Sequence, residues 1–444
     1  MFHSRYKVIL AAVYLVSCFT AIGQTSSISN PNSQRENNPY SRFGIGESWD
    51  GSGISMKGMA NASSAFADPY TINTDNPASY SFLKLTTFEG GLFGSTRNIS
   101  DADGRAYSTG TATLNNISIG IPIAKNAGIS FGLKPFTKSY YALVDTIGYP
   151  TSPIGNVVRY YNGSGSLNMP YIGAGYKYKS LSVGFNLGYL FGSSSQTVSA
   201  YPIDTAILNK AYSSNFVKVN EIGGLYWKAG ALFSHHIIDT SYTLNIGATL
   251  TLDQKLKQQM NYYQISRFSF GDTTANDSSY RSGDKNGSLQ MPMSYSIGAS
   301  LNKGENWTVG VDYSATNWTK FKSDVDSLMN SNIGTGSYKL SLGGAYTPNP
   351  NDIKNYFSRV TFRLGFYLGQ DYLLINNNTI KSMGFTFGGS FPYKKSLRSH
   401  SRINASFDIG KMGTTANGLL QQTYVRFGFG MTFNEKWFIQ RKYD

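Results

Sequence analysis

Apolar residues alternate with small or polar ones over long stretches of the chain, and this alternation constrains the fold more than any other feature. One stretch, 425–433, has Val425, Phe427, Phe429, Met431 and Phe433 at every second position, with Arg426, Gly428, Gly430 and Thr432 between them. Similar patterns cover 181–191, 242–252, 291–301 and 360–368. Because successive side chains of a strand point to opposite faces, each stretch predicts a strand with one apolar face and one small or polar face.

Apolar and polar residues also alternate along the strands of a soluble β-sandwich, so composition and strand length must distinguish it from a membrane barrel. Charged residues make up 14% of the chain and aromatic residues another 14%, whereas soluble domains carry about 25% charge. Many alternating stretches exceed the five or six residues typical of globular sheets, and tilted membrane strands need about 9–11. The aromatic content also excludes a disordered chain. The sequence therefore predicts an all-β, transmembrane antiparallel β-barrel.

Counting the alternating segments gives a barrel of about 14 strands, an even number as in bacterial single-chain barrels. The predicted strands are 86–98, 109–123, 126–145, 157–178, 180–199, 221–235, 241–265, 287–302, 305–322, 336–347, 357–371, 379–391, 400–413 and 420–434. Short and long connections alternate between them. Since such barrels have short periplasmic turns and long outer loops, we expect both termini in the periplasm, below the outer membrane of a Gram-negative bacterium.

The region before the first predicted strand does not alternate, and it divides into three parts. Residues 1–23 have a basic start and an apolar run, as in a signal peptide; Leu15-Val16-Ser17-Cys18 also resembles a lipobox, which would leave Cys18 lipidated. The stretch 24–36 is expected to be flexible. Residues 37–85 are rich in small residues and contain aromatic packing groups, so they predict a plug inside the lumen. The barrel is then expected over 86–438, followed by a periplasmic tail at 439–444.

Searches for catalytic, metal and nucleic-acid sites give little. The pair His235-His236 falls at a predicted turn, and no metalloprotease, P-loop or nucleophile-elbow motif is present. We expect neither an enzyme nor a cofactor. The chain carries a formal net charge of +14, and its basic stretches 394–398 and 436–442 lie at predicted periplasmic ends, where lysine and arginine suit anionic lipid headgroups rather than nucleic acid.

Two motifs in the predicted plug resemble a known family. The small-residue stretch from Gly58 to Asp68, followed by Asn76-Pro77-Ala78 just before the first strand, resembles the hatch of the FadL/TodX family of outer-membrane transporters. The opening 38–46 and the ending 434–442 look like a divergent branch. The resemblance implies a 14-stranded barrel with an N-terminal hatch. It also implies passive uptake of hydrophobic molecules, such as long-chain fatty acids, by hatch movement and lateral exit through the wall.

Lateral exit needs a break in strand pairing, and proline removes a ladder donor. Pro135 and Pro170 interrupt the third and fourth predicted strands, so each marks either a lateral opening or a bulge. Asn76-Pro77-Ala78 is expected to form a tight turn into the first strand. A second function stays open: a non-transporting barrel subunit or scaffold of an outer-membrane secretion or assembly complex, with protein partners in that membrane.

Overall fold

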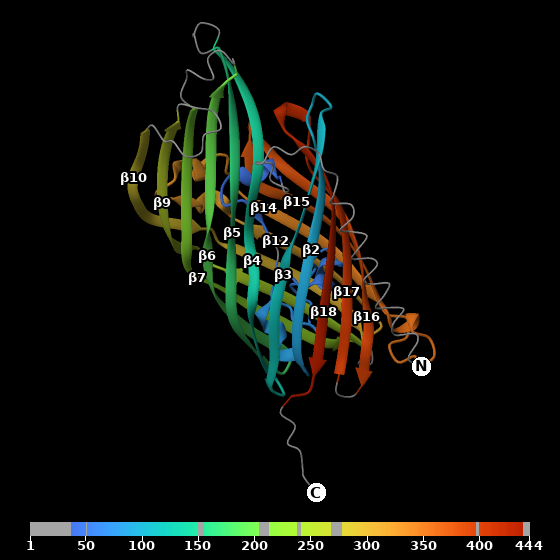
Figure 1. The fold of residues 1–444 in the computed structure, drawn as a ribbon. Helices are drawn as coiled ribbons and strands as arrows, with labels where there is room; N and C mark the ends of the chain where they lie inside the picture. Colours follow the sequence, from blue (N-terminus) through green and yellow to red (C-terminus); the bar gives the residue numbers. More distant parts are fainter. Residues whose placement is uncertain are drawn as a thin grey trace. The chain divides into compact units, whose positions relative to one another are not determined.

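The computed structural model describes residues 37–49, 51–149, 155–203, 213–237, 241–267, 278–396 and 399–437 (Figure 1). The predicted signal peptide, the segment 24–36 and the tail 439–444 lie outside these ranges. No helix in the described ranges has the length and hydropathy of a membrane-spanning helix.

The wall is a closed antiparallel barrel of 14 strands, as predicted. Its strand elements are β2 (Thr86–Ser100), β3 (Ala106–Ala124), β4 (Ala127–Tyr149), β5 (Gly155–Tyr178), β6 (Leu181–Pro202), β7 (Ser213–Ile237), β8 (Tyr242–Thr251), β9 (Gln254–Arg267), β10 (Ser278–Met291), β11 (Ser294–Lys303), β12 (Trp307–Thr316), β14 (Ser337–Tyr346), β15 (Thr361–Ile375), β16 (Asn378–Ser396), β17 (Ser399–Gly413) and β18 (Gln421–Glu435). The last strand closes the ring by pairing with the first, from Gln421 opposite Ser100 to Glu435 opposite Thr86.

Two of the fourteen strands are each built from two elements. One strand of the wall is β8 followed by β9, because β7 pairs with both in turn. The next is β10 followed by β11, which pair with β9 and β8 respectively. The breaks lie side by side, where Pro292 lacks an N–H and the Asp253 carboxylate accepts a hydrogen bond from the Met293 amide (2.7 Å). The wall therefore bends at this level without losing its closure.

The two faces of the wall differ as the alternation predicts. Outward side chains such as Ile172, Leu364 and Phe385 are more than half exposed, and together with similar residues on the other strands they form an apolar belt. Inward side chains are small or polar and are buried, among them Thr386 and Ser406, each 2% exposed. This is the surface that a barrel presents to hydrocarbon outside and to a filled lumen inside.

Residues 37–49 and 51–85, which we call the luminal segment, lie inside the wall (Figure 1). Their elements are η1 (Pro39–Arg42), β1 (Glu47–Ser48), α2 (Ile54–Lys57) and η2 (Pro77–Phe82). The segment touches inward glycines on distant strands: a Cβ added at Gly247 of β8 would lie 1.9 Å from the Ser64 carbonyl oxygen, and one at Gly184 of β6 would lie 2.3 Å from the Pro77 carbonyl carbon. Glycines recur on the inward face because the luminal segment packs directly on the wall backbone there.

The connections depart from the predicted alternation in the last third of the chain. Residues 347–360, which include η5 (Phe357–Arg359), join β14 to β15 at the end of the barrel where the other turns are short. At the opposite end, β15 and β16 are joined by Asn376 and Asn377 alone, both with positive φ (49° and 61°). A two-residue turn of this kind suits asparagine, which tolerates the left-handed region. We call the two ends of the barrel the short-turn end and the long-loop end.

Replacing Phe385 by arginine tests the membrane-facing belt. Phe385 is the central exposed apolar residue of β16 and packs on Phe366, with ring centroids 4.8 Å apart. We expect Phe385→Arg to lower the free energy of unfolding in lipid vesicles by about 2–4 kcal/mol. The control Phe385→Leu loses an aromatic pair and should cost only about 0.5–1.5 kcal/mol. Urea titration measures both, and equal effects of the two substitutions would contradict the belt.

Candidate functional site

The wall has a gap between β3 and β4. These strands pair only from Ala124 opposite Ala127 up to Ile117 opposite Leu133. Beyond that point β3 stays paired with β2 up to Ala106, and β4 stays paired with β5 up to Tyr149. The two strands therefore separate from each other toward the long-loop end while each keeps its outer neighbour.

Bulges on both strands mark the start of the gap. The register of β4 against β5 shifts between Pro135 and Thr137, and that of β3 against β2 shifts at Asn115, between the pairs made by Leu114 and Asn116. A bulge bends its strand and increases the local twist, so bulges at one level turn the two strands apart. Asn115 donates its side-chain amide to the Ser52 carbonyl of the luminal segment (2.7 Å), and Phe136 packs on Tyr226, with ring centroids 5.2 Å apart.

The gap overlaps the apolar belt. Its lower end, at Ile117, lies beside Gly90 of β2, which pairs with Met431 of β18. Further along, Gly110 of β3 lies at the level of Val425, through Thr96. Met431 and Val425 are exposed apolar residues of the belt. Residues 110–117 of β3 therefore separate from β4 at the level where the wall faces hydrocarbon.

The luminal segment occupies the free edge of β4. Residues 47 and 48 of β1 pair with Lys138 and Thr137. The Asn38 amide donates to the Tyr140 carbonyl (2.7 Å), and the Trp49 amide donates to the Phe136 carbonyl (2.9 Å).

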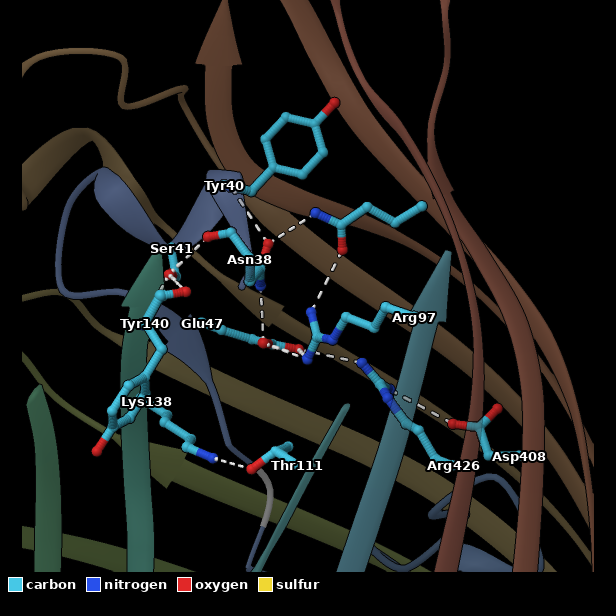
Figure 2. A network of polar contacts seen from close by, with 11 residues as sticks. Asn38, Tyr40, Ser41, Glu47, Arg97, Thr111, Lys138, Tyr140, Asp408 and Arg426 are labelled. Carbon is cyan, nitrogen blue, oxygen red and sulfur yellow. Dashed lines mark hydrogen bonds and ion pairs between the residues drawn. The ribbon is translucent and has the colours of Figure 1, made fainter. Parts of the chain in front are cut away.

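Side chains complete this edge (Figure 2). The Tyr140 amide donates to the Ser41 hydroxyl (3.0 Å), and the Ala142 amide donates to the Asn37 side-chain oxygen (3.1 Å). Across the gap to β3, the Lys138 ammonium donates to the Thr111 hydroxyl (3.2 Å). The stretch 37–49 thus takes the place that β3 leaves, and pairs with backbone groups of β4 that β3 does not reach.

One carboxylate, Glu47, holds this stretch in place (Figure 2). It accepts hydrogen bonds from Arg97 (2.6 Å), Arg426 (3.1 Å) and the Asn38 side-chain amide (2.8 Å). Burial alone would raise the pKa of Glu47. The charges of Arg97 and Arg426, with the hydrogen bonds from Arg97 and Asn38, outweigh that effect and hold this pKa below its ordinary value.

The long-loop end of the lumen is filled by the chain's own side chains. The connection between β12 and β14 contains η3 (Trp318–Lys320), β13 (Lys322–Ser323) and η4 (Ser327–Asn330), and it folds over the mouth. There Trp318 stacks on Tyr372 at 4.0 Å between centroids. Asp326 accepts a hydrogen bond from Asn220 on the inner face of β7 (2.8 Å). Tyr40 and Ile45 of the luminal segment belong to the same buried cluster, which we call the mouth cluster.

A cavity of about 530 Å³ lies between the luminal segment and the wall. Pro135 and Phe136 line it at the gap, and it extends to inward residues of β12, β14, β15 and β17. Its lining combines aromatic groups such as Trp49 with charged ones such as Lys339 and Asp312. The cavity thus reaches the β4 side of the gap, and it offers both apolar surface and charge. In the described residues no group of three or more histidine, cysteine, aspartate or glutamate side chains is arranged to hold a metal ion.

The residues singled out from the sequence lie in five different places. Asn76 is fully buried and binds the Ser64 carbonyl (2.6 Å) and the Ala231 carbonyl of β7 (3.1 Å). Its side-chain oxygen accepts from the Ala78 amide (3.1 Å), so Asn76 caps η2 with Pro77 at its first position. The predicted tight turn is therefore the start of a 3₁₀ helix, because this cap directs the chain into helical hydrogen bonds.

The other predicted residues lie apart from one another. The two prolines do not share a site, and neither do the two ends of the small-residue stretch. Gly58 approaches the backbone of Gly388 on β16, and Asp68 accepts from the Tyr70 amide (2.6 Å) near the short-turn end. Pro135 lies at the gap. Pro170 does not: the pairing of β5 with β6 skips residues 169 and 170, but the register is the same on both sides of them and β4 pairs opposite Pro170. The structure brings neither Gly58 nor Asp68 to the gap.

Sequence reasoning missed Glu47 and the bulge at Asn115. A signal for Glu47 existed: Arg97 and Arg426 occupy inward positions of alternating strands, and a buried arginine requires an anionic partner from the lumen. No comparable signal marks Asn115, because a single extra residue does not disturb the alternation enough to be seen.

Comparison with solved structures supports the fold. The Ralstonia pickettii toluene transporter TbuX is similar over 86% of this chain and 98% of its own, with 13% identity and a TM-score of 0.53. The Pseudomonas putida toluene transporter TodX matches over 87% and 99%, with 16% identity and a TM-score of 0.53. A Pseudomonas aeruginosa FadL homologue matches over 87% and 98%, with 12% identity and a TM-score of 0.54. The predicted resemblance to the FadL/TodX family is thereby confirmed for the fold.

Sequence comparisons add one family. The search of curated proteins finds no match. The sequence model of the BamG family matches residues 6–444.

Replacing Glu47 by glutamine tests how the edge of β4 is held. The substitution leaves Arg97, 2% exposed, without its counter-charge, and removing one partner of a buried ion pair costs about 3–5 kcal/mol. We expect a folded barrel in which residues 37–49 become accessible to protease and ion conductance in planar bilayers rises. The control Glu435→Gln removes an exposed carboxylate from the same wall and should change neither.

The pH dependence of ion conductance should also distinguish Glu47→Gln from the native protein. Because the pKa of Glu47 lies below its ordinary value of 4.5, its stabilising effect is complete above that pH and is lost only as the pH falls through the lowered pKa. The native protein should therefore conduct poorly at neutral pH and more at strongly acidic pH, whereas Glu47→Gln should lack this Glu47-dependent step. An unchanged acid step in Glu47→Gln would contradict the assignment.

Proposed function

Taking as a premise that the chain belongs to the BamG family and has the fold of the FadL-type channels, we propose that it is a passive outer-membrane channel for hydrophobic small molecules. In this proposal both termini lie in the periplasm, and the short-turn end faces it. The basic residues of that end contact anionic lipid headgroups. The proposal involves no chemical step and no cofactor.

The observation that carries the proposal is the gap between β3 and β4 at the level of the apolar belt. The free energy of an apolar molecule falls when it leaves a polar environment for hydrocarbon. A sideways exit into the membrane is therefore favourable for such a molecule and unfavourable for an ion. The cavity reaches the gap at Pro135 and Phe136. Its mixture of aromatic and charged lining suits an amphiphile such as a long-chain fatty acid.

Exit requires the stretch 37–49 to leave the edge of β4. Each hydrogen bond that it gives up there is worth about 0.5–1.5 kcal/mol, and the ion pairs of Glu47 add to that. The closed arrangement is therefore the resting state, and a molecule must compensate for these contacts to open it. This hatch movement is the finer part of the proposal.

One observation bears on the alternative function, the mouth cluster. Trp318, Phe321 and Met329 are buried in this cluster at the long-loop end of the lumen. If that cluster does not rearrange, the barrel serves as a subunit or scaffold of an outer-membrane complex instead of a channel. The two functions predict different effects of a permanently closed gap on the uptake of hydrophobic molecules.

Linking the two sides of the gap tests the channel directly. In Thr111→Cys with Lys138→Cys, a short bismaleimide should span the place where these side chains now touch. We expect uptake of labelled oleate and of toluene by intact cells to fall to the level of cells without the protein. Each single-cysteine variant, treated in the same way, should keep native uptake.

The opposite result would favour the scaffold. If the cross-linked barrel takes up both probes at the native rate, the gap is not the exit. If cells lacking the protein also take up both probes normally but lose other outer-membrane proteins, the chain acts in an assembly and not as a channel.

A further inference from the structure

A second cavity lies at the short-turn end, away from the gap. Its volume is about 370 Å³, and its lining comes from the luminal segment around Tyr70, the turn at 304–306, both ends of the connection 347–360, and β17. It takes no part in the route proposed above. Its lining is rich in arginine.

Three guanidiniums line this cavity, outnumbering the two carboxylates in its lining. They are Arg359, Arg363 and Arg402, and none of them forms an ion pair within the ranges that the structure describes. Arg363 is 7% exposed; it donates to the Ser390 hydroxyl, while its Nε has no hydrogen-bond partner. The Nε of Arg359 is likewise buried and without a partner. The charge of Arg402 repels Arg363, and the carboxylates of Asp68 and Glu89 attract it without forming an ion pair.

The balance of charge in the cavity is positive. Lys84 and Lys177 add two cations, against the carboxylates of Asp68 and Glu305, and Asp68 already accepts a hydrogen bond from the Tyr70 amide. Keeping an unpaired guanidinium out of water is costly. Guanidinium forks bind carboxylates through two parallel hydrogen bonds. The arrangement therefore suits anionic groups supplied from outside the chain.

The connection that supplies Arg359 also presents an apolar tip. Ile353 is 93% exposed and Phe357 is 68% exposed, and Phe357 lies one turn of η5 before Val360, whose amide donates to its carbonyl (3.2 Å). The connection is ordered by Asp352, which accepts from the amides of Lys354 and Asn355. These exposed apolar side chains belong to the same ordered connection whose Pro350 and Arg359 line the cationic cavity, so one connection presents both chemistries.

We propose that this surface docks an acidic, apolar segment of a second protein. Carboxylates of that segment bind Arg359, Arg363 and Arg402, and its apolar side chains cover Ile353 and Phe357. A free anion such as phosphate would occupy the cavity and leave the apolar tip in water, whereas a polypeptide covers both. The proposal does not depend on transport, because the cavity and the gap lie at different ends of the barrel.

Binding of a defined peptide tests the surface. The probe is a fluorescein-labelled decapeptide of alternating aspartate with leucine or phenylalanine, titrated onto the full chain in detergent and followed by anisotropy. We expect binding that weakens with salt and falls at least tenfold in the double variant Arg359→Gln/Arg402→Gln. It should also fall severalfold in Ile353→Ser/Phe357→Ser. The buried Arg363 is left unchanged so that the fold is kept.

The controls separate this proposal from the channel. Lys303→Gln removes an exposed cation of the same end that does not line the cavity, and it should bind the peptide as the native chain does. The double arginine variant should keep native oleate uptake. A peptide with asparagine in place of aspartate should not bind. Equal binding of the asparagine peptide, equal binding by the double variant, absence of peptide binding, or binding of inorganic phosphate alone would each overturn the proposal.

Discussion

Every backbone N–H and C=O inside a membrane needs a partner within the protein, and the architecture described here follows from that requirement. Fourteen strands meet it by closing on themselves, with β18 paired to β2. Between β3 and β4 the wall does not meet it alone. There the stretch 37–49 supplies the missing donors and acceptors to β4. The luminal segment is therefore part of the wall as well as its filling.

The luminal segment is held in two different ways along its length. Residues 37–49 are bound to the edge of β4, through Glu47 to Arg97 and Arg426, and through Tyr40 and Ile45 to the mouth cluster. Residues 58–85 are packed on inward glycines and tied by buried hydrogen bonds, such as that of the Ser64 amide to Asp312 (2.6 Å) and that of the Ala60 amide to Thr386 (2.9 Å). Contacts of the second kind involve close backbone approach and adjust less readily than ion pairs and side-chain caps.

The sequence predicted the wall well because the relevant signal is local. The alternation of Val425 to Phe433 assigns each residue to a face, and the structure places these residues on β18 as expected. The inward glycines were visible too, although their purpose became clear only when Ser64 and Pro77 were found against Gly247 and Gly184. Connection 347–360 departs from the predicted alternation, because it is long at the end of the barrel where the other turns are short.

The site was less predictable because it depends on contacts between distant segments. Pro135 was identified from its missing N–H, but Pro170 has the same chemistry and leaves the wall register unchanged. The difference lies in the partner strand: β3 has its own bulge beside Pro135, at Asn115. Likewise, the arginines of the second cavity come from two strands and one connection, and no spacing in the sequence brings Arg359, Arg363 and Arg402 together.

The central claim is that the edge of β4 beyond Leu133 is paired with the luminal segment and not with β3. Hydrogen–deuterium exchange of the full chain in lipid nanodiscs, compared with an Asn37→Ala/Ser41→Ala variant, tests it most directly. The account predicts that the amides of Tyr140 and Ala142 lose protection in the variant, since Ser41 and Asn37 are their acceptors, while the amides of 129–133 stay protected. Unchanged protection at Tyr140 and Ala142 would mean that β3 pairs with β4 there, and would contradict the gap.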